Sequence, residues 1–270
     1  ILVYAMYRGF ISVTRPRATR SDLNTLARLG WTVFISSLFL VTNTFVDKIF
    51  ASGLEAGSIS SVAYSNTLTN FGMLVFQFSL VSVMFTRMSE FIAENDMAGC
   101  NLYLLNNMRR LARIVVPVSL AVSVASYEVV RVLFERDAFS AEDTVRTADA
   151  LSMYMLGMPA FLINLVVARV FHSLRKLRDK MWLSLQFLLT NVAGNLILVE
   201  RLQVMGLAIS TATAINVHLA LSAYVLSRYR VGLDVGRLSG LILVQYLLAV
   251  ATWTIYRLAG LGPILERLVD

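Results

Sequence analysis

The chain has 270 residues, of which 57% are hydrophobic and 15% are charged, whereas soluble domains carry roughly 25% charged residues. A net charge of +7 would suggest a nucleic-acid partner in a soluble protein, but the mean hydropathy of +0.68 makes membrane topology the better explanation. Cys100 is the only cysteine, which excludes an internal disulfide and a cysteine-built metal site.

Seven long apolar stretches follow one another along the chain. Each has 19 to 30 residues, and about 20 apolar residues in a helix cross a hydrocarbon layer ~30 Å thick. The stretches cover residues 29–50, 57–86, 111–133, 145–172, 181–199, 204–227 and 239–258. The sequence therefore predicts an all-α, polytopic membrane helix bundle with about seven full transmembrane helices. A partial helix is expected at the N-terminus, because the chain opens at Ile1 inside an apolar run and reads as part of something larger.

Basic residues gather in alternate connections between these stretches. Four connections hold 17 of the 24 Lys and Arg residues, at 8–28, 87–113, 169–180 and 228–237. The connections between them, at 47–55, 128–149 and 200–201, are balanced or acidic. Because Lys and Arg are retained on the cytoplasmic side, we expect helix 29–50 to run outward and the basic connections to face the cytoplasm.

Two segments are less regular than a plain span. Residues 88–108 are too polar to cross a membrane, so an amphipathic stretch on the cytoplasmic interface and an ordinary loop both fit. Gly157 and Pro159 lie inside the fourth stretch and should weaken or kink that helix.

Asp47 stands near the outer end of the first full span. A carboxylate there is costly unless it is solvated, paired or holding a cation. Asn191 and Asn195 are four residues apart on one face of the fifth stretch, and Thr211 lies in the sixth. Together these side chains offer only oxygen ligands, which suit a hard cation. Hydrogen bonding between helices is the alternative that the residues alone favour.

The second stretch carries a polar stripe. Asn66, Asn70 and Gln77 are spaced by four and by seven residues, so they share one helix face. This stripe predicts the wall of a wet cavity, and packing against another helix is the alternative.

The sequence shows no catalytic constellation of the soluble type. His172 and His218 lie far apart and lack metal-ligand spacing, and no Gly-rich phosphate loop follows a strand. We therefore expect a transporter rather than an enzyme, without an organic cofactor, driven by an ion gradient or the membrane potential.

Several strings, in the same order along the chain, resemble the lipid II flippases (the MurJ or MviN family). They are FVDKIFASGLEAGSISSVAYSNTL, then VLFERDAFSAEDT with ALSMYMLGMPAF and ARVFHSLRKLRD, and finally MGLAISTATAINVHLALSAYVLSR. That family belongs to the multidrug/oligosaccharidyl-lipid/polysaccharide exporter superfamily, whose members have two six-helix lobes. The resemblance implies multi-pass insertion in the bacterial cytoplasmic (inner) membrane and movement of lipid II to the outer leaflet by alternating access.

The resemblance also implies how the chain is divided. Residues 1–28 would be the end of a preceding helix and a basic cytoplasmic loop, and residues 29–228 the second six-helix lobe. Residues 229–270 would hold a cytoplasmic loop, one further transmembrane helix and a C-terminal segment. The implied partners are the missing first lobe, an undecaprenyl-linked substrate, membrane lipids and cell-wall synthesis proteins, but no nucleic acid.

Residue by residue, the resemblance implies a sodium (Na+) site. Its side-chain ligands would be Asp47, Asn191, Asn195 and Thr211, with a backbone carbonyl near Leu207.

The implied substrate cavity departs from the family. Its expected residues are Asn66, Thr67, Asn70 and Gln77. Thr67 stands where the family has an arginine that helps to hold the lipid pyrophosphate, and a hydroxyl replaces neither the charge nor the fork of donors of a guanidinium. Two alternatives therefore stay open: a flippase of another polyprenyl-linked glycan, and a degenerate transporter that acts as a membrane scaffold for cell-wall enzymes.

Overall fold

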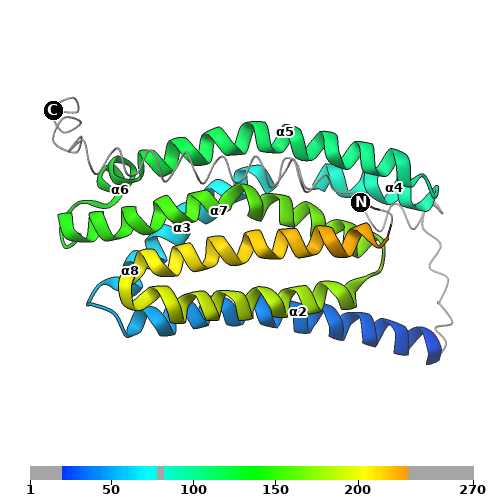
Figure 1. The fold of residues 1–270 in the computed structure, drawn as a ribbon, viewed down its shortest axis with the longest axis horizontal. Coiled ribbons are helices and arrows are strands. Elements are labelled where there is room, and N and C mark those ends of the chain that lie inside the picture. The colour runs from blue at the N-terminus through cyan, green and yellow to red at the C-terminus, as the bar shows by residue number, and fades with distance from the viewer. Residues whose placement is uncertain (1–19, 78–81, 230, 232–270) are drawn as a thin grey trace, which may run out of the picture.

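The computed structural model describes residues 20–77, 82–229 and 231, and all regular secondary structure in these ranges is helical. The helices are α2 (Arg20–Ser52), α3 (Ser58–Phe76), α4 (Ser82–Ala93), α5 (Met97–Val124), α6 (Ser126–Phe134), α7 (Ala141–Ser173) and α8 (Leu177–Ser227). They form an elongated bundle (Figure 1), which confirms the predicted all-α class. The expected partial helix at the N-terminus and the apolar stretch 239–258 lie outside the described residues.

Helix α7 is the centre of the bundle, and α2 lies at its surface. In the most apolar window of α7, 83% of the residues are buried, against 6% for α2. Helix α7 packs against α3, α4, α5, α6 and α8, whereas α2 packs mainly against α8. The N-terminus of α7 is capped by a capping box, in which the side chains of Ser140 and Asp143 accept hydrogen bonds from each other's backbone N–H groups. Helix α8 is thus held by the central helix, and α2 is held in turn by α8.

Helix α8 is a pair of antiparallel arms. The chain leaves helical geometry at Gln203 (φ 51°, ψ −133°) and turns back on itself, as Figure 1 shows. An added Cβ at Gly206 would lie 2.7 Å from the carbonyl oxygen of Leu198, so a glycine permits this close approach. The two arms correspond to the predicted stretches 181–199 and 204–227.

The second and third apolar stretches are divided. Residues 57–86 give α3 and the start of α4, and α5 meets α6 at an angle of 68° next to Ala125. Residues 88–108 form the end of α4, a turn and the start of α5, so this segment is helical rather than an ordinary loop. The side chain of Asp96 caps α5 by accepting from the N–H of Gly99 at 2.8 Å. Helix α7 continues through Pro159 without interruption, because membrane helices tolerate proline.

The charge pattern of the connections is reproduced in space. The start of α2, the α4–α5 turn, the α7–α8 turn and the end of α8 all lie at one end of the bundle (Figure 1). The α2–α3 and α6–α7 connections and the turn at Gln203 lie at the other end. We call these the basic end and the opposite end. This arrangement is the one that the alternating basic connections predict.

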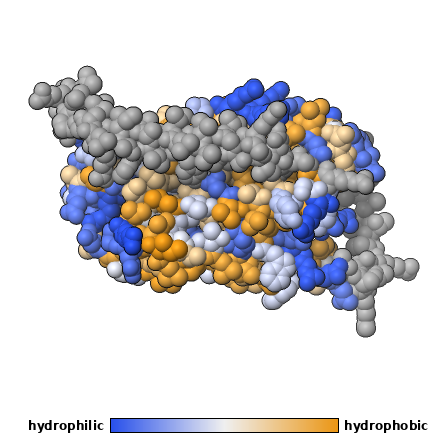
Figure 2. All heavy atoms as spheres, viewed as in Figure 1, coloured by the Kyte–Doolittle hydropathy of each residue, from blue (hydrophilic) through white to orange (hydrophobic). Residues whose placement is uncertain are grey.

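Length and surface identify a membrane protein. Leu26–Ser52, Ala141–Ser173 and Leu177–Ser227 are long and apolar enough to cross a membrane, and the bent pair of α5 and α6 is a further candidate. Large apolar side chains of α2 are exposed, among them Trp31, Phe45 and Ile49 at 60–69%. Figure 2 shows hydrophobic residues over the middle of the visible face and hydrophilic residues toward both ends.

Candidate functional site

The side chain of Asp47 joins α2 to the first arm of α8. Asp47 lies in the last two turns of α2 and is 6% exposed. Its Oδ1 accepts hydrogen bonds from Nδ2 of Asn191 at 2.7 Å and from Nδ2 of Asn195 at 2.8 Å. Both asparagines are fully buried, and their four-residue spacing turns both toward α2. The structure thus brings together three residues that the sequence singled out.

The second arm of α8 adds Thr211. Its Oγ1 lies 3.5 Å from Oδ2 of Asp47 and 3.2 Å from Oδ1 of Asn191. Gly194 makes this possible, because an added Cβ there would lie 2.9 Å from the side chain of Ser210 on the opposite arm. Leu207 is buried one turn before Thr211, and a role for its carbonyl group stays a prediction.

Asn43 belongs to the same cluster and was missed by the sequence analysis. It is 6% exposed, and its Nδ2 lies 3.5 Å from Oδ2 of Asp47. The signal in the sequence was its four-residue spacing from Asp47, which places both on one face of α2. Within the described part of the chain, the buried Oδ1 atoms of Asn43 and Asn195 have no hydrogen-bond partner. A carboxylate, a hydroxyl and unpaired carboxamide oxygens fit a hard cation such as sodium.

A cavity of about 460 Å³ opens beside this cluster, between α2, α3, α7 and α8. Asp47, Thr211, Asn66 and Asn70 all line it, so two of the four predicted substrate-cavity residues share a cavity with Asp47 and Thr211. We call it the Asp47 cavity.

Two other predicted residues, Thr67 and Gln77, are not among the described residues that line the Asp47 cavity. Thr67 is exposed, and its Oγ1 donates to the carbonyl oxygen of Ala63 at 2.8 Å. It follows Asn66 by one residue, which rotates it about 100° away from the face that Asn66 presents. Gln77 stands at the C-terminal end of α3, beyond the last lining residue of that helix, Met73.

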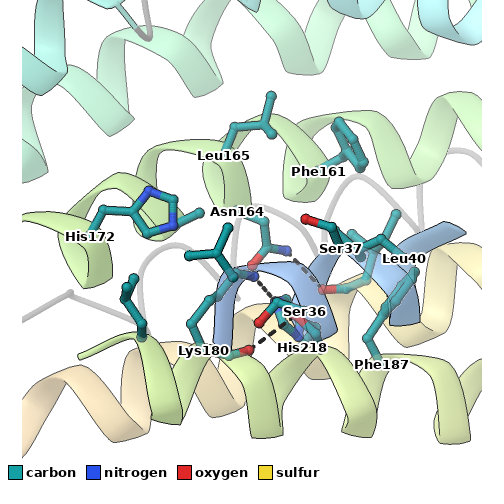
Figure 3. A pocket seen from close by; sticks show the side chains of 15 residues that line it. Ser36, Ser37, Leu40, Phe161, Asn164, Leu165, His172, Lys180, Phe187 and His218 are labelled. Carbon is teal, nitrogen blue, oxygen red and sulfur yellow. Dashed lines mark hydrogen bonds between the residues drawn. The ribbon is translucent and has the colours of Figure 1, made fainter. Parts of the chain in front are cut away.

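A second cavity, of about 240 Å³, lies nearer the basic end between α2, α7 and α8 (Figure 3). Nζ of Lys180, in the first arm of α8, lies 3.0 Å from Nε2 of His218 in the second arm. Nδ1 of His218 lies 3.0 Å from the carbonyl oxygen of Leu183. Because an ammonium group can only donate, Nε2 accepts, and the imidazole donates its Nδ1–H to the carbonyl oxygen. We call this the Lys180 cavity.

The sequence analysis did not find the Lys180 cavity. It counted Lys180 among the charges of a connection and dismissed His172 and His218 for want of metal spacing. Both histidines line the cavity. The available signal was that Lys180 directly precedes the fifth apolar stretch, where a helical side chain can point into the bundle.

Solved structures with this fold are membrane transporters. One, described as "Lipid II flippase MurJ, inward closed conformation", matches 98% of this chain and 60% of its own with a TM-score of 0.67 and 19% identity. Another, an outward-facing MATE family transporter of the MOP superfamily, matches 76% of this chain and 45% of its own with a TM-score of 0.66 and 16% identity. At these identities the likeness shows the fold alone, which is a helical lobe of the type found in MOP transporters.

The family follows from the sequence match. The family model of the lipid II flippase MurJ matches residues 1–263, and the chain belongs to this family, as the resemblance predicted. The protein of Rickettsia prowazekii described as "Probable lipid II flippase MurJ" is 25% identical over 203 residues, covering 75% of this chain and 40% of the relative. The relative from Buchnera aphidicola subsp. Acyrthosiphon pisum, described in the same words, is 31% identical over 169 residues, covering 61% and 32%. The chain therefore spans less than half the length of these curated relatives.

Proposed function

We propose that this chain is the second lobe of a flippase that moves lipid II across the bacterial cytoplasmic membrane by alternating access. The observation that carries the proposal is the family match over residues 1–263. The structure adds a cavity that is bordered by four helices of the lobe and is lined in part by Asp47, Asn66 and Asn70. In this proposal the chain works with a first lobe, with an undecaprenyl-linked substrate, with membrane lipids and with cell-wall synthesis proteins, and it performs no catalytic step.

The proposal includes a sodium ion at the Asp47 cluster. Asp47, Asn191, Asn195 and Thr211 would hold it, with the carbonyl group of Leu207 as a further ligand. The ion would supply positive charge to a buried carboxylate whose hydrogen-bond donors among the described residues are amides and a hydroxyl group. Asp47 bonds the end of α2 to both arms of α8. Whether its carboxylate holds an ion therefore affects how strongly these helices are held together.

The proposal is tested with proteoliposomes that carry the protein together with its first lobe. We expect lipid II flipping that depends on the sodium gradient and that falls at least about tenfold in Asp47→Asn, because one charge-assisted contact contributes roughly 1.5–3 kcal/mol. Glu55→Gln is the matched control, since Glu55 is an exposed acid just beyond the same end of α2 and pairs with Arg146 outside the Asp47 cavity. If the rate of flipping depends neither on the sodium gradient nor on Asp47→Asn, the proposed coupling to sodium is contradicted. If the wild-type protein does not flip lipid II at all, the proposed flippase function is contradicted.

Thr67 supports two alternatives to a lipid II flippase. An exposed threonine supports a different polyprenyl-linked glycan as cargo, or a scaffold that no longer transports. Depletion of the protein with flipping measured directly separates these readings, because undisturbed flipping with disturbed wall assembly favours the scaffold. For the cargo, Thr67→Arg should strengthen lipid II binding if the missing guanidinium is what weakens pyrophosphate recognition.

A further inference from the structure

Lys180 brings a positive charge into the lobe, and no carboxylate of the described residues lines the cavity that it enters. Of the described residues that line the Lys180 cavity, none is acidic, and the basic side chains there are Lys180, His172 and His218. The ammonium group of Lys180 donates to Nε2 of His218, and this nitrogen accepts a hydrogen bond only when the imidazole is neutral. The neighbouring acid, Asp179, accepts from the hydroxyl group of Tyr229 and does not line the cavity. An unbalanced cation inside a membrane protein is expected to meet an anion.

The walls of the cavity indicate what kind of anion fits. They are mostly hydrocarbon, supplied by Phe161 and Leu165 of α7, Phe187 and Ile215 of α8, and Leu40 of α2 (Figure 3). A free inorganic anion makes no favourable contact with such walls. An anion attached directly to a hydrocarbon chain can pair with the ammonium group and also pack its chain against the apolar walls.

The position of the cavity favours a phosphate. Leu177 and Lys180 belong to the first turn of α8, where unpaired backbone N–H groups and the helix dipole attract anions. Ser37 and His172 also line the cavity and are exposed, so a ligand can enter between α2 and α7. The cavity lies toward the basic end of the bundle, where Lys and Arg residues raise the local concentration of anions.

We propose that the Lys180 cavity binds a phosphate carried directly on a hydrocarbon chain, as in a polyprenyl phosphate. Lys180 donates to a phosphate oxygen, and the apolar walls hold the first carbons of the chain. A glycerophospholipid fits less well, because a polar glycerol ester separates its phosphate from its acyl chains. The inference rests on the proposed function for the identity of the amphiphile.

Binding of farnesyl phosphate to the purified full chain in detergent tests the proposal, with farnesol and dihexanoyl phosphatidylglycerol as comparison ligands. We expect Lys180→Gln to weaken farnesyl phosphate binding about tenfold or more and to leave farnesol binding within about twofold, because only the charged contact is lost. Lys176→Gln is the matched control: it removes the same charge one turn earlier, where Nζ lies over the ring of Tyr229 outside the cavity.

Ser37→Trp is a second variant in case Lys180→Gln folds poorly. Ser37 is exposed at the rim, so a large side chain there should block entry to the cavity, and binding of both farnesyl phosphate and farnesol should fall. Farnesyl phosphate binding that is unchanged in both variants overturns the proposal, and so does tighter binding of the phosphatidylglycerol than of farnesyl phosphate. Sodium-driven lipid II flipping alongside such a result would leave the proposed function intact, so the two failures are distinguishable.

Discussion

The Asp47 cavity and the Lys180 cavity adjoin each other and are built in opposite ways. They share four apolar wall residues, Leu40, Phe161, Phe187 and Ile215. In the part of the chain that the structure describes, one contains a buried carboxylate that meets amide and hydroxyl donors, and the other contains an ammonium group that meets a neutral imidazole. The lobe thus keeps the buried carboxylate of Asp47 and the ammonium group of Lys180 in separate cavities that share these apolar walls. The exposed Lys48 also lines the Asp47 cavity.

The largest expected effect comes from the feature that both cavities share, the two arms of α8. Gly206→Ala would place a Cβ 2.7 Å from the carbonyl oxygen of Leu198, a backbone atom that cannot move alone. We expect a loss of about 1–3 kcal/mol in stability, seen as a lower Tm, together with weaker binding at both cavities. The control is Gly30→Ala, where a Cβ meets nothing within 4 Å and alanine favours the helix by about 1 kcal/mol. Equal Tm values for the two variants would contradict the close packing of the arms.

Asp47→Asn should affect ligand binding at the Asp47 cavity and not at the Lys180 cavity. We expect NaCl to stabilise the wild type relative to choline chloride by ~2.7 kcal/mol when sodium is a hundredfold above its Kd, which is seen as a rise in Tm. The neutral side chain of Asp47→Asn should abolish this rise. Lys180→Gln should leave this rise unchanged, because it lines only the other cavity. A sodium response that survives in Asp47→Asn would place the ion elsewhere.

Asn43→Ala tests the residue that the sequence analysis missed. Removing its unpaired buried oxygen should weaken sodium binding about tenfold, less than the loss of the carboxylate, because a neutral ligand contributes less than a charged one. Asn107→Ala is the comparison, since its Nδ2 only donates to the carbonyl oxygen of Tyr103 within α5. An unchanged sodium affinity in Asn43→Ala would contradict a role for Asn43 as a sodium ligand.

Thr67→Arg should have the smallest effect on the lobe itself. Thr67 is exposed, and its hydroxyl group donates to the carbonyl oxygen of Ala63 in its own helix, so the free energy of unfolding should change by no more than about 0.5 kcal/mol. Sodium binding and farnesyl phosphate binding to the purified chain should also stay the same. A marked fall in Tm would show that Thr67 packs more tightly than its exposure indicates.

The sequence predicted what depends on spacing within one helix. Asn191 and Asn195 share a face because they are four residues apart, and a lone carboxylate in an apolar span had to meet something polar. The alternating basic connections likewise predicted which helix ends lie together. Each of these inferences uses local geometry and the cost of burying a polar group.

What could not be predicted depends on how distant segments are aligned. Lys180 and His218 meet because the turn at Gln203 sets the register of two arms, and the two residues lie 38 positions apart. The sharp bend next to Ala125 occurs without a glycine or proline, whereas Pro117 lies inside a continuous helix. Tertiary packing determines the register of the two arms and the position of the bend, and no short sequence pattern indicates either of them.

The most direct test of the two-cavity account is a cross-over experiment on the purified chain. Sodium-dependent Tm and farnesyl phosphate affinity are measured for the wild type, Asp47→Asn and Lys180→Gln. The account predicts that Asp47→Asn loses only the sodium response and that Lys180→Gln loses only the tight phosphate binding. If either variant lost both responses while keeping its fold, or kept both, the separation of opposite charges into two binding cavities would be contradicted.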